Sequence, residues 1–459
     1  MPRIHGLVLF AAVGALGALA ALSALTANPL AAQDTTAQRG VRIGLTYAAG
    51  IKPGVIVLPV RGPGGDSLQA ILSRDLDFGD RVTIIGAAGT NTGDALRGLS
   101  GNAAAGRGTM NYDLVARLGG AAVVEAVPTP TGLRVALHDV GAKGVLQTAD
   151  FPLPLDYGSR DWRWAVHGIA DEVERWITGV QGIAQTRVLY AHGGRAYVVD
   201  SDGASPVAVT DAADGKALSP AWHPSGRFMA FSAMGDRGTQ IVVRDLGART
   251  SRRLVATPGG LNITPTFSPD GSALVYAHGE EVGTNLFVAD PFGTGGGRQI
   301  TVGRGSDNVS PSFAPGGERL AFTSGRSGHP EVYIMDADGA NAELLTPFAF
   351  GDQFYRSNPD WSPDGRSIAF QSLIDGRFQI MTISLRDRTI RQHTSEGANE
   401  DPSWAPDGQH VVFTSTRTGA KQLFVLDVES GRVRQLTHAG DARMSAWSPR
   451  LGDGRRSGR

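Results

Sequence analysis

The sequence predicts a mainly β protein in which a small α/β domain precedes a six-bladed β-propeller. A motif of Pro, any residue, an aromatic, any residue, Pro, any residue and Gly recurs through the C-terminal part of the chain, with a partial last copy, and its aromatic positions are spaced 43 to 48 residues apart. That period suits one four-stranded propeller blade. Glycine accounts for 62 of 459 residues, about twice its usual share, as expected of a chain rich in tight turns.

The first 32 residues have the pattern of a secretory signal peptide. Arg3 and His5 precede a run from residue 6 to residue 32 that contains no charged side chain. We expect cleavage between residues 27 and 33. An uncleaved anchor helix is the alternative, but the Ala and Gly in this run make it weakly hydrophobic for a membrane span. We therefore expect export and no transmembrane segment in the mature protein.

Residues 33–180 are predicted to form an α/β domain. Strands are expected at residues 40–46 and 54–59, a short helix at 67–76, and a hairpin from 122–127 and 132–137. The clearest helix covers residues 160–177, where apolar residues recur at steps of three and four and form one stripe. Residues 86–108 are expected to form a loop with a poorly defined helix, and residues 179–185 to join the two domains.

The repeat predicts six propeller blades over residues 186–449. Its aromatic positions are Trp222, Phe267, Phe313, Trp361, Trp404 and Trp447. Each is followed by a turn such as Pro-Asp-Gly, in which Gly adopts a positive φ at little cost, and then by alternating apolar runs typical of strands. Residues 187–190, 196–200 and 206–210 supply three strands of a unit whose first strand lies at 445–449. Pairing these two ends would close the ring and leave no open edge. Residues 450–459 are expected to form a solvated basic tail.

Composition excludes several classes of function. Forty-three basic residues balance 44 acidic ones, so the chain lacks the positive excess needed to coat nucleic acid or an anionic membrane. The absence of cysteine excludes a thiol nucleophile, thiolate zinc sites, iron–sulfur clusters and disulfides.

The sequence contains no convincing catalytic or metal motif. A propeller-capped serine hydrolase needs a G-x-S-x-G turn, and the nearest string, residues 325–328, lacks its spacing. His167 is expected to be a packing residue, and no H-E-x-x-H motif is present. Residues 200–203 and 336–339 resemble calcium loops without the Glu at position 12, so we interpret them as hairpin turns. We predict no catalytic residue, no cofactor and no metal site; a cation in the central channel has no sequence marker.

The blades and the junction between the domains resemble the TolB family, the periplasmic component of the Tol–Pal envelope system. The junction carrying this resemblance comprises residues 165–171, 178–179 and 182–188. The resemblance implies a monomeric, non-enzymatic periplasmic scaffold. It implies that the propeller binds the peptidoglycan-associated lipoprotein Pal and that the mature N-terminal segment binds TolA. The system maintains outer-membrane integrity and supports constriction during cell division.

The same resemblance implies two sets of partner-binding residues. The segment matching the TolA-binding end is residues 41–50, which differs from the family in having no acidic residue after Ile43 and could add a strand to a partner sheet. On the propeller, loops ahead of the Pro-x-aromatic motif would ring one channel entrance and bind Pal. The alternative for each Asn there is turn geometry. The candidate residues are Val41, Arg42, Ile43 and Tyr47 for TolA, and Asn262, Asn308, Arg356 and Asn399 for Pal.

Two other functions remain open on sequence grounds. An exported propeller could instead bind a cell-wall glycan or another peptide or protein, because fold alone does not determine the client. A remnant of a propeller-capped serine hydrolase is the other possibility. A neighbouring gene for a Pal-like lipoprotein would favour the scaffold.

Overall fold

The computed structural model describes residues 51–86, 110–236, 238–255, 260–281, 283–294, 296–303, 306–348 and 354–451. The predicted signal peptide, the predicted strand at 40–46, nearly all of the predicted loop at 86–108 and residues 452–459 lie outside these ranges. None of the helices within them has the length and apolar character needed to cross a membrane.

The N-terminal part is built on a five-stranded mixed sheet. Its strands, in spatial order, are β2 (Thr83–Ile84), β1 (Gly54–Val57), β3 (Ala122–Thr129), β4 (Gly132–Asp139) and β5 (Gly144–Pro152). β1 pairs in parallel with β2 and β3, whereas β3, β4 and β5 form an antiparallel meander. The predicted hairpin around residues 128–131 is therefore confirmed, and β5 extends it by a strand that the sequence analysis did not predict.

Within the described residues, three helices accompany this sheet: α1 (Gly65–Phe78), α3 (Tyr112–Arg117) and α4 (Arg160–Thr178). The helices predicted at 67–76 and 160–177 are confirmed. The Ser159 hydroxyl accepts a hydrogen bond from the backbone N–H of Trp162 and so caps the start of α4. Gly179 ends the helix in a left-handed conformation with a φ of 79°. These local signals explain why the boundaries of α4 follow the sequence pattern closely.

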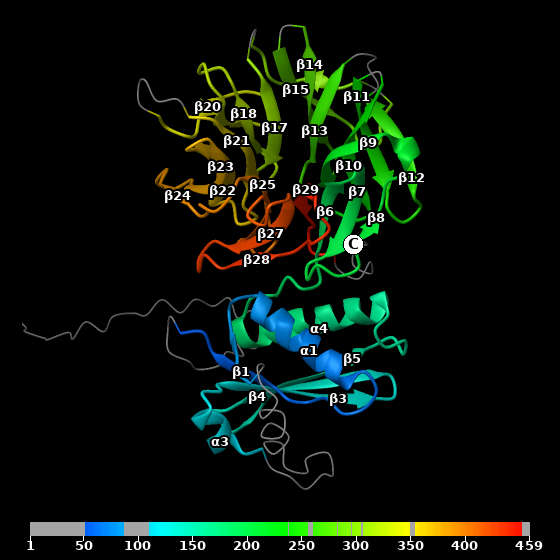
Figure 1. Cartoon of the computed structure of the whole chain (residues 1–459), viewed down its shortest axis with the longest axis vertical. Helices are drawn as coiled ribbons and strands as arrows, with labels where there is room; N and C mark the ends of the chain where they lie inside the picture. The colour runs from blue at the N-terminus through cyan, green and yellow to red at the C-terminus, as the bar shows by residue number, and fades with distance from the viewer. Residues whose placement is uncertain are drawn as a thin grey trace, which may run out of the picture. The chain divides into compact units, whose positions relative to one another are not determined.

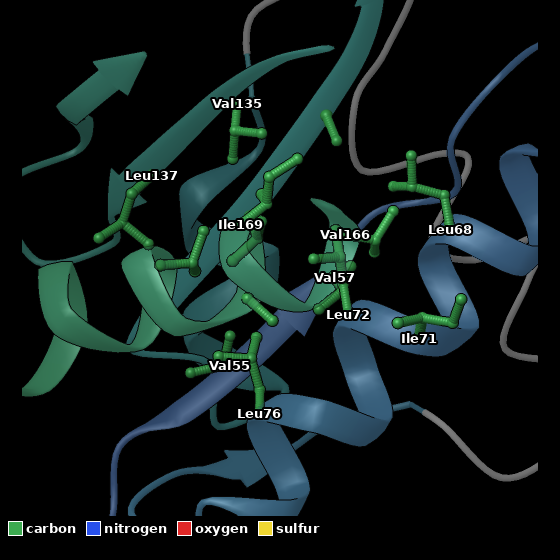
Figure 2. Packing of buried hydrophobic residues seen from close by; sticks show 14 of the residues in the cluster. Val55, Val57, Leu68, Ile71, Leu72, Leu76, Val135, Leu137, Val166 and Ile169 are labelled. Carbon is green, nitrogen blue, oxygen red and sulfur yellow. The ribbon is translucent and has the colours of Figure 1, made fainter. Parts of the chain in front are cut away.

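The core of this part lies between the sheet and helices α1 and α4, whose apolar faces pack against it. Leu72 and Leu76 on α1 and Val166 on α4 are fully buried among side chains from β1 and β4 (Figure 2). Burying apolar surface supplies most of the stability of such a layer. Helix α4 is thus held by its apolar stripe, as its spacing predicts.

Six four-stranded antiparallel sheets form the propeller (Figure 1). Five of them are each formed by one continuous stretch of chain: β9 (Lys216–Trp222), β10 (Phe228–Gly235), β11 (Gly238–Asp245) and β12 (Thr250–Val255); β13 (Leu261–Phe267), β14 (Leu274–Glu280), β15 (Gly283–Ala289) and β16 (Arg298–Gln299); β17 (Asn308–Phe313), β18 (Arg319–Ser324), β19 (Glu331–Asp336) and β20 (Glu343–Leu344); β21 (Arg356–Trp361), β22 (Ser367–Ile374), β23 (Arg377–Ser384) and β24 (Ile390–Gln392); β25 (Asn399–Trp404), β26 (His410–Ser415), β27 (Gln422–Asp427) and β28 (Val433–Gln435). A short 3-10 helix, η2 (Ala212–Asp214), precedes β9.

The sixth sheet joins two distant parts of the chain, as the sequence predicts. It contains β6 (Arg187–His192), β7 (Arg195–Asp200), β8 (Val207–Ala208) and β29 (Arg443–Trp447), and β29 lies beside β6 in Figure 1. Trp447 pairs with Val188, and the Trp447 indole donates a 2.8 Å hydrogen bond to the Thr186 hydroxyl. The ring is therefore closed by strand pairing, and the predicted mainly β, six-bladed fold class is confirmed.

The turn after each aromatic residue also behaves as predicted. In the clearest copies, Gly271, Gly365 and Gly408 have φ values of 75°, 73° and 68°. A side chain at such positions is strained, which explains why Gly ends the motif. Arg450 departs from prediction: its guanidinium donates to the carbonyls of Gln181 and Gly182, so this residue is not part of a solvated tail.

Candidate functional site

The innermost strands of all six blades surround a central cavity of about 170 Å³. Each blade contributes three consecutive residues, and the middle one is Pro in five of the six. The lining triplets are residues 219–221, 264–266, 310–312, 358–360, 401–403 and 444–446. This cavity is the channel predicted from the repeat.

The first residue of each triplet has a left-handed backbone conformation, which the sequence analysis did not predict. These six residues are Ser219, Thr264, Ser310, Asn358, Asp401 and Met444, with φ values from 46° to 55°. The pairing of the innermost strand with its neighbour shifts register at this point in every blade. A non-glycine residue in this region costs free energy. Because the same conformation occurs in every blade, we attribute it to the architecture of the channel wall.

Hydrogen bonds connect neighbouring blades along this wall. The Ser310 hydroxyl donates to Asn358 Oδ1 at 2.9 Å, and Asn358 Nδ2 donates to Asp401 Oδ1 at 2.6 Å. Asp360 accepts the Trp404 amide at 2.7 Å and the Ser312 hydroxyl at 3.0 Å. These bonds hold the polar groups of the wall in place from one blade to the next.

The two channel carboxyl groups, Asp360 and Asp401, are half-buried in the channel wall. Burial raises the pKa of Asp360 to about 6, against the hydrogen bonds that favour its charged form. Burial and the neighbouring Glu400 also raise the pKa of Asp401. Within the described ranges, no group of three or more His, Cys, Asp or Glu side chains is arranged to hold a metal ion.

The four propeller residues suggested by the resemblance occupy equivalent positions in four consecutive blades. Asn262 is the second residue of β13, while Asn308, Arg356 and Asn399 begin β17, β21 and β25. The prediction that they lie in loops is wrong, because each is paired in the strand ladder with the end of the next strand. They nevertheless share one end of the innermost strands, opposite to the end that carries the Pro-x-Gly turns.

All four of these side chains are buried and bonded within the protein. Asn262 Nδ2 donates to the Thr239 carbonyl at 2.8 Å, and Asn399 Nδ2 donates to Gln379 Oε1 at 2.8 Å. Asn308 Nδ2 makes the corresponding bond to the Thr284 carbonyl at 3.2 Å. Each amide therefore ties its strand to the preceding blade, and its role in binding a partner stays a prediction.

Arg356 is also engaged inside the protein. Its guanidinium lies 3.3 Å from Glu331 Oε2, donates to the Pro347 carbonyl at 2.9 Å, and is centred 4.0 Å from the Phe354 ring. Burial raises the pKa of Glu331, although Thr346 and Arg356 favour its charged form. A charge reversal at Arg356 would therefore place two acidic groups together in a buried site.

Two further arginines at this end were missed by the sequence analysis. Arg326 Nε donates to the Ser324 hydroxyl at 2.9 Å and its Nη2 donates to Asn308 Oδ1 at 3.1 Å. Arg417 repeats this arrangement with Ser415 and Asn399. Each guanidinium lies over two aromatic rings of its blade. The signal that could have revealed them is Ser-x-Arg, repeated at residues 324–326 and 415–417.

The same end of the propeller exposes several large apolar side chains. They lie at the end of β10, the start of β13, beyond β16, just before β21 and near the end of β22. These residues are Met234, Leu261, Val302, Tyr355 and Leu373, with exposed fractions between 37% and 83%. Apolar and aromatic residues beside arginines are typical of the central part of a protein–protein interface.

The four candidate TolA-binding residues, Val41, Arg42, Ile43 and Tyr47, lie outside the described residues. Their role stays a prediction. The turns at 200–203 and 336–339 are confirmed as hairpin turns, because Gly203 and Gly339 donate to the carbonyls of Asp200 and Asp336. His167 is fully buried, as expected of a packing residue, and its Nδ1 lies 2.6 Å from Asp75 Oδ2.

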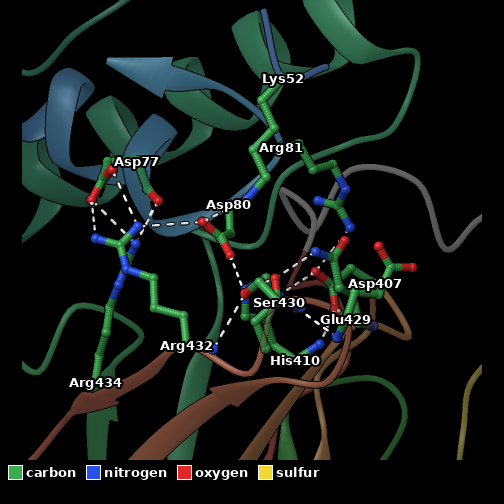
Figure 3. A network of polar contacts seen from close by, with 12 residues as sticks. Lys52, Asp77, Asp80, Arg81, Asp407, His410, Glu429, Ser430, Arg432 and Arg434 are labelled. Carbon is green, nitrogen blue, oxygen red and sulfur yellow. Dashed lines mark hydrogen bonds and ion pairs between the residues drawn. The ribbon is translucent and has the colours of Figure 1, made fainter. Parts of the chain in front are cut away.

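Polar contacts connect the end of α1 and the segment after it with the β25–β28 blade (Figure 3). Arg81 lies between Glu174 and Asp407, at 2.8 and 3.0 Å, and all three side chains are largely buried. Asp77 pairs with Arg432 and Arg434. Burial opposes ionisation of Asp407, but His410 and Arg81 outweigh it and hold the pKa of Asp407 well below its usual range.

The comparisons with known proteins agree with this architecture. Residues 174–449 match the family described as the TolB beta propeller domain. The Tol-Pal system protein TolB of Mannheimia succiniciproducens is 32% identical over 162 residues, which cover 33% of this chain and 37% of that protein. The Tol-Pal system protein TolB of Pasteurella multocida is 32% identical over 165 residues, covering 33% and 38%. The matched stretches thus span less than half the length of these curated relatives.

A solved structure shares the fold. The crystal structure of TolB from Acinetobacter baumannii aligns with a TM-score of 0.72 at 23% identity, covering 87% of this chain and 97% of that one. At this identity the likeness concerns the fold alone. The match over residues 174–449 covers more than half of the chain. The chain therefore belongs to the TolB beta propeller family.

Proposed function

We propose that this protein is a non-enzymatic periplasmic scaffold of the Tol–Pal system. In this role the propeller binds the peptidoglycan-associated lipoprotein Pal, and residues 41–50 bind TolA, as a monomer with no cofactor. Its contribution to the cell would be outer-membrane integrity and constriction during division. The domain limits we propose are residues 33–180 for the α/β domain and 186–449 for the propeller, after removal of residues 1–32.

The observation that carries the Pal assignment is the chemistry of one end of the propeller. Exposed Tyr355, Leu373 and Leu261 lie at this end, together with Arg326 and Arg417. Each of these arginines is held by a serine, an asparagine and two aromatic rings, so little side-chain freedom is left to lose on binding. Asn308 and Asn399 act here as anchors for the arginines.

Calorimetry with purified residues 33–459 and Pal from the same organism tests this assignment. Arg326→Gln and Tyr355→Ala should each weaken binding, because hot spots of protein interfaces are enriched in Arg and Tyr. Arg366→Gln is the matched control, since Arg366 is exposed in the turn at the opposite end of the blades. Saturable binding with this pattern supports the proposal. No binding at high micromolar Pal would contradict it and favour another glycan or peptide client.

The TolA part of the proposal has a separate test. Removing residues 33–50 should abolish binding of the TolA domain while leaving Pal affinity unchanged. Unchanged binding of TolA after this deletion would exclude the segment containing Val41, Arg42, Ile43 and Tyr47 as its site.

A further inference from the structure

A second cavity lies between the closing blade and the blade that follows it in the chain. Its volume is about 380 Å³, and it shares no lining residue with the central channel. Apolar side chains from both blades contribute to its wall, among them Val198, Val209, Trp222 and Leu246. Gly226 and Leu451 meet at its edge, where a Cβ on Gly226 would come 2.2 Å from Leu451 Cδ2.

Five arginines line this cavity, whereas Asp211 is its one acidic lining residue among those the structure describes. The arginines come from α4, β6, the turn before β10, β11 and the turn after it. They are Arg160, Arg187, Arg227, Arg244 and Arg249. A cavity of this size that combines apolar walls with a few charged groups has the composition of a small-molecule site.

The acidic partners of these arginines leave part of the positive charge uncompensated. Arg160 and Arg187 share one carboxylate, that of Asp200, at 3.8 and 2.9 Å. Arg227 pairs with Asp245 at 2.7 Å. Exposed Arg249 makes no ion pair with any residue in the described ranges.

Hydrogen-bonding capacity is also left over inside the cavity wall. The Arg244 side chain is only 5% exposed and pairs with Asp214 at 2.8 Å through Nη1 and with Asp211 at 3.2 Å through Nη2. Its Nε is buried and makes no hydrogen bond within the described part of the chain, and the same holds for Arg160 Nε. A buried donor without an acceptor is unfavourable, so the protein alone does not satisfy these two guanidinium groups fully.

From this arrangement we propose that the cavity binds a small organic anion in which a carboxylate adjoins an apolar group. The carboxylate would accept hydrogen bonds from the arginines, whose planar guanidinium groups match its geometry. The apolar group would lie against Val198, Val209 and Trp222. The site is separate from the residues assigned to Pal and TolA, so it does not depend on the proposed function.

The test uses three probes and the chain without residues 1–32, which retains every described residue. N-acetyl-L-leucine carries both features, N-acetyl-L-leucinamide has the same apolar group without the charge, and inorganic phosphate has charge without the apolar group. We expect binding of N-acetyl-L-leucine by calorimetry at low salt, with binding of the amide and of phosphate at least about tenfold weaker.

Two variants identify the site. Arg249→Gln and Arg160→Gln should each weaken binding of N-acetyl-L-leucine about tenfold, because each removes a charged hydrogen-bond donor. Arg253→Gln is the matched control: it changes an exposed arginine on β12 that does not line the cavity, and should leave affinity unchanged. Melting curves of the three variants should coincide with that of the parent chain.

Three results would overturn the proposal. If no binding of N-acetyl-L-leucine were detected at about 10 mM, the cavity would not be a binding site for this class of ligand. If phosphate bound as tightly as N-acetyl-L-leucine, the apolar group of the ligand would contribute nothing to binding, and the proposed ligand class would be wrong. Equal affinities in Arg249→Gln, Arg160→Gln and Arg253→Gln would place the ligand elsewhere on the protein.

Discussion

Replacing Arg81 by Met should be among the most destabilising single substitutions in this protein. The Arg81 side chain is 14% exposed, and its partners Glu174 and Asp407 are 2% and 0% exposed, at 2.8 and 3.0 Å. Removing the guanidinium leaves two buried carboxylates with no cation between them. Breaking a buried pair in this way costs about 3–5 kcal/mol of unfolding free energy. Urea unfolding followed by circular dichroism measures the loss.

The pH dependence of this variant gives a second and independent readout. Burial raises the pKa of Glu174 above its ordinary value of 4.5, and Arg81 opposes that rise. Without Arg81 the folded-state pKa of Glu174 should rise further. A carboxyl group with a raised folded-state pKa binds its proton more tightly in the folded chain, so its destabilising effect grows as the pH rises and fades as it falls. The deficit of Arg81→Met should therefore be smaller at pH 5 than at pH 7.

A matched substitution separates this effect from the loss of any arginine. Arg134 forms a two-point ion pair with Asp150 on the same sheet, but both side chains are more than half exposed. Solvent screens such a pair, so Arg134→Met should change stability only slightly. In an Asp407→Asn background, Arg81→Met should cost less than in the parent chain. Equal losses for Arg81→Met and Arg134→Met, or a deficit that does not vary with pH, would refute this reasoning.

Three further outcomes are expected. Leu72→Ala should lower the free energy of unfolding by about 2–5 kcal/mol in urea titrations, because fully buried Leu72 packs between α1 and the sheet; an effect within error would show that the cavity collapses. Trp447→Phe should cost about 1 kcal/mol by removing the 2.8 Å bond to Thr186 at the ring closure, and a double variant with Thr186→Val should show that the two losses are not additive. Burial raises the pKa of Asp171 from 3.8 to about 7, so stability should fall as the pH rises between these values; Asp171→Asn should reduce that slope, and an unchanged slope would show that this carboxyl group is not its source.

The parts of the fold that follow from local periodicity could be predicted from the sequence. Helix α4 has apolar residues at steps of three and four, a Ser before it and a Gly after it, and these features determine where it begins and ends. The blades follow from a repeated turn motif, and their closure follows from two incomplete units at distant positions. Each signal lies in a short stretch of chain.

The parts that depend on tertiary pairing could not be predicted in this way. β5 packs only Leu146, Ala149 and Phe151 against the core, and its other positions include Gly, Gln, Thr and Asp, so its apolar pattern is weak. β2 has two residues and exists because it pairs with β1. The left-handed residues of the channel wall include five that precede Pro, where sequence rules favour an extended backbone.

For the candidate site, the sequence pattern pointed to one end of the propeller but did not predict the exposed residues that lie there. The resemblance implies loop positions for Asn308 and Asn399, whereas both are buried at the start of strands. Their amide oxygens accept hydrogen bonds from Arg326 and Arg417. Single residue types do not reveal such pairings, since the partners are brought together only by the blade.

The pairing of β29 with β6 has a consequence for how the protein must be made. The closing blade obtains its innermost strand from residues 443–447, more than two hundred positions after β6. A ribosomal product that stops between β28 and β29 retains five whole blades but leaves β6 with an unpaired edge, which another chain could occupy. Only a chain that extends through residue 447 can therefore close the ring without leaving the edge of β6 exposed.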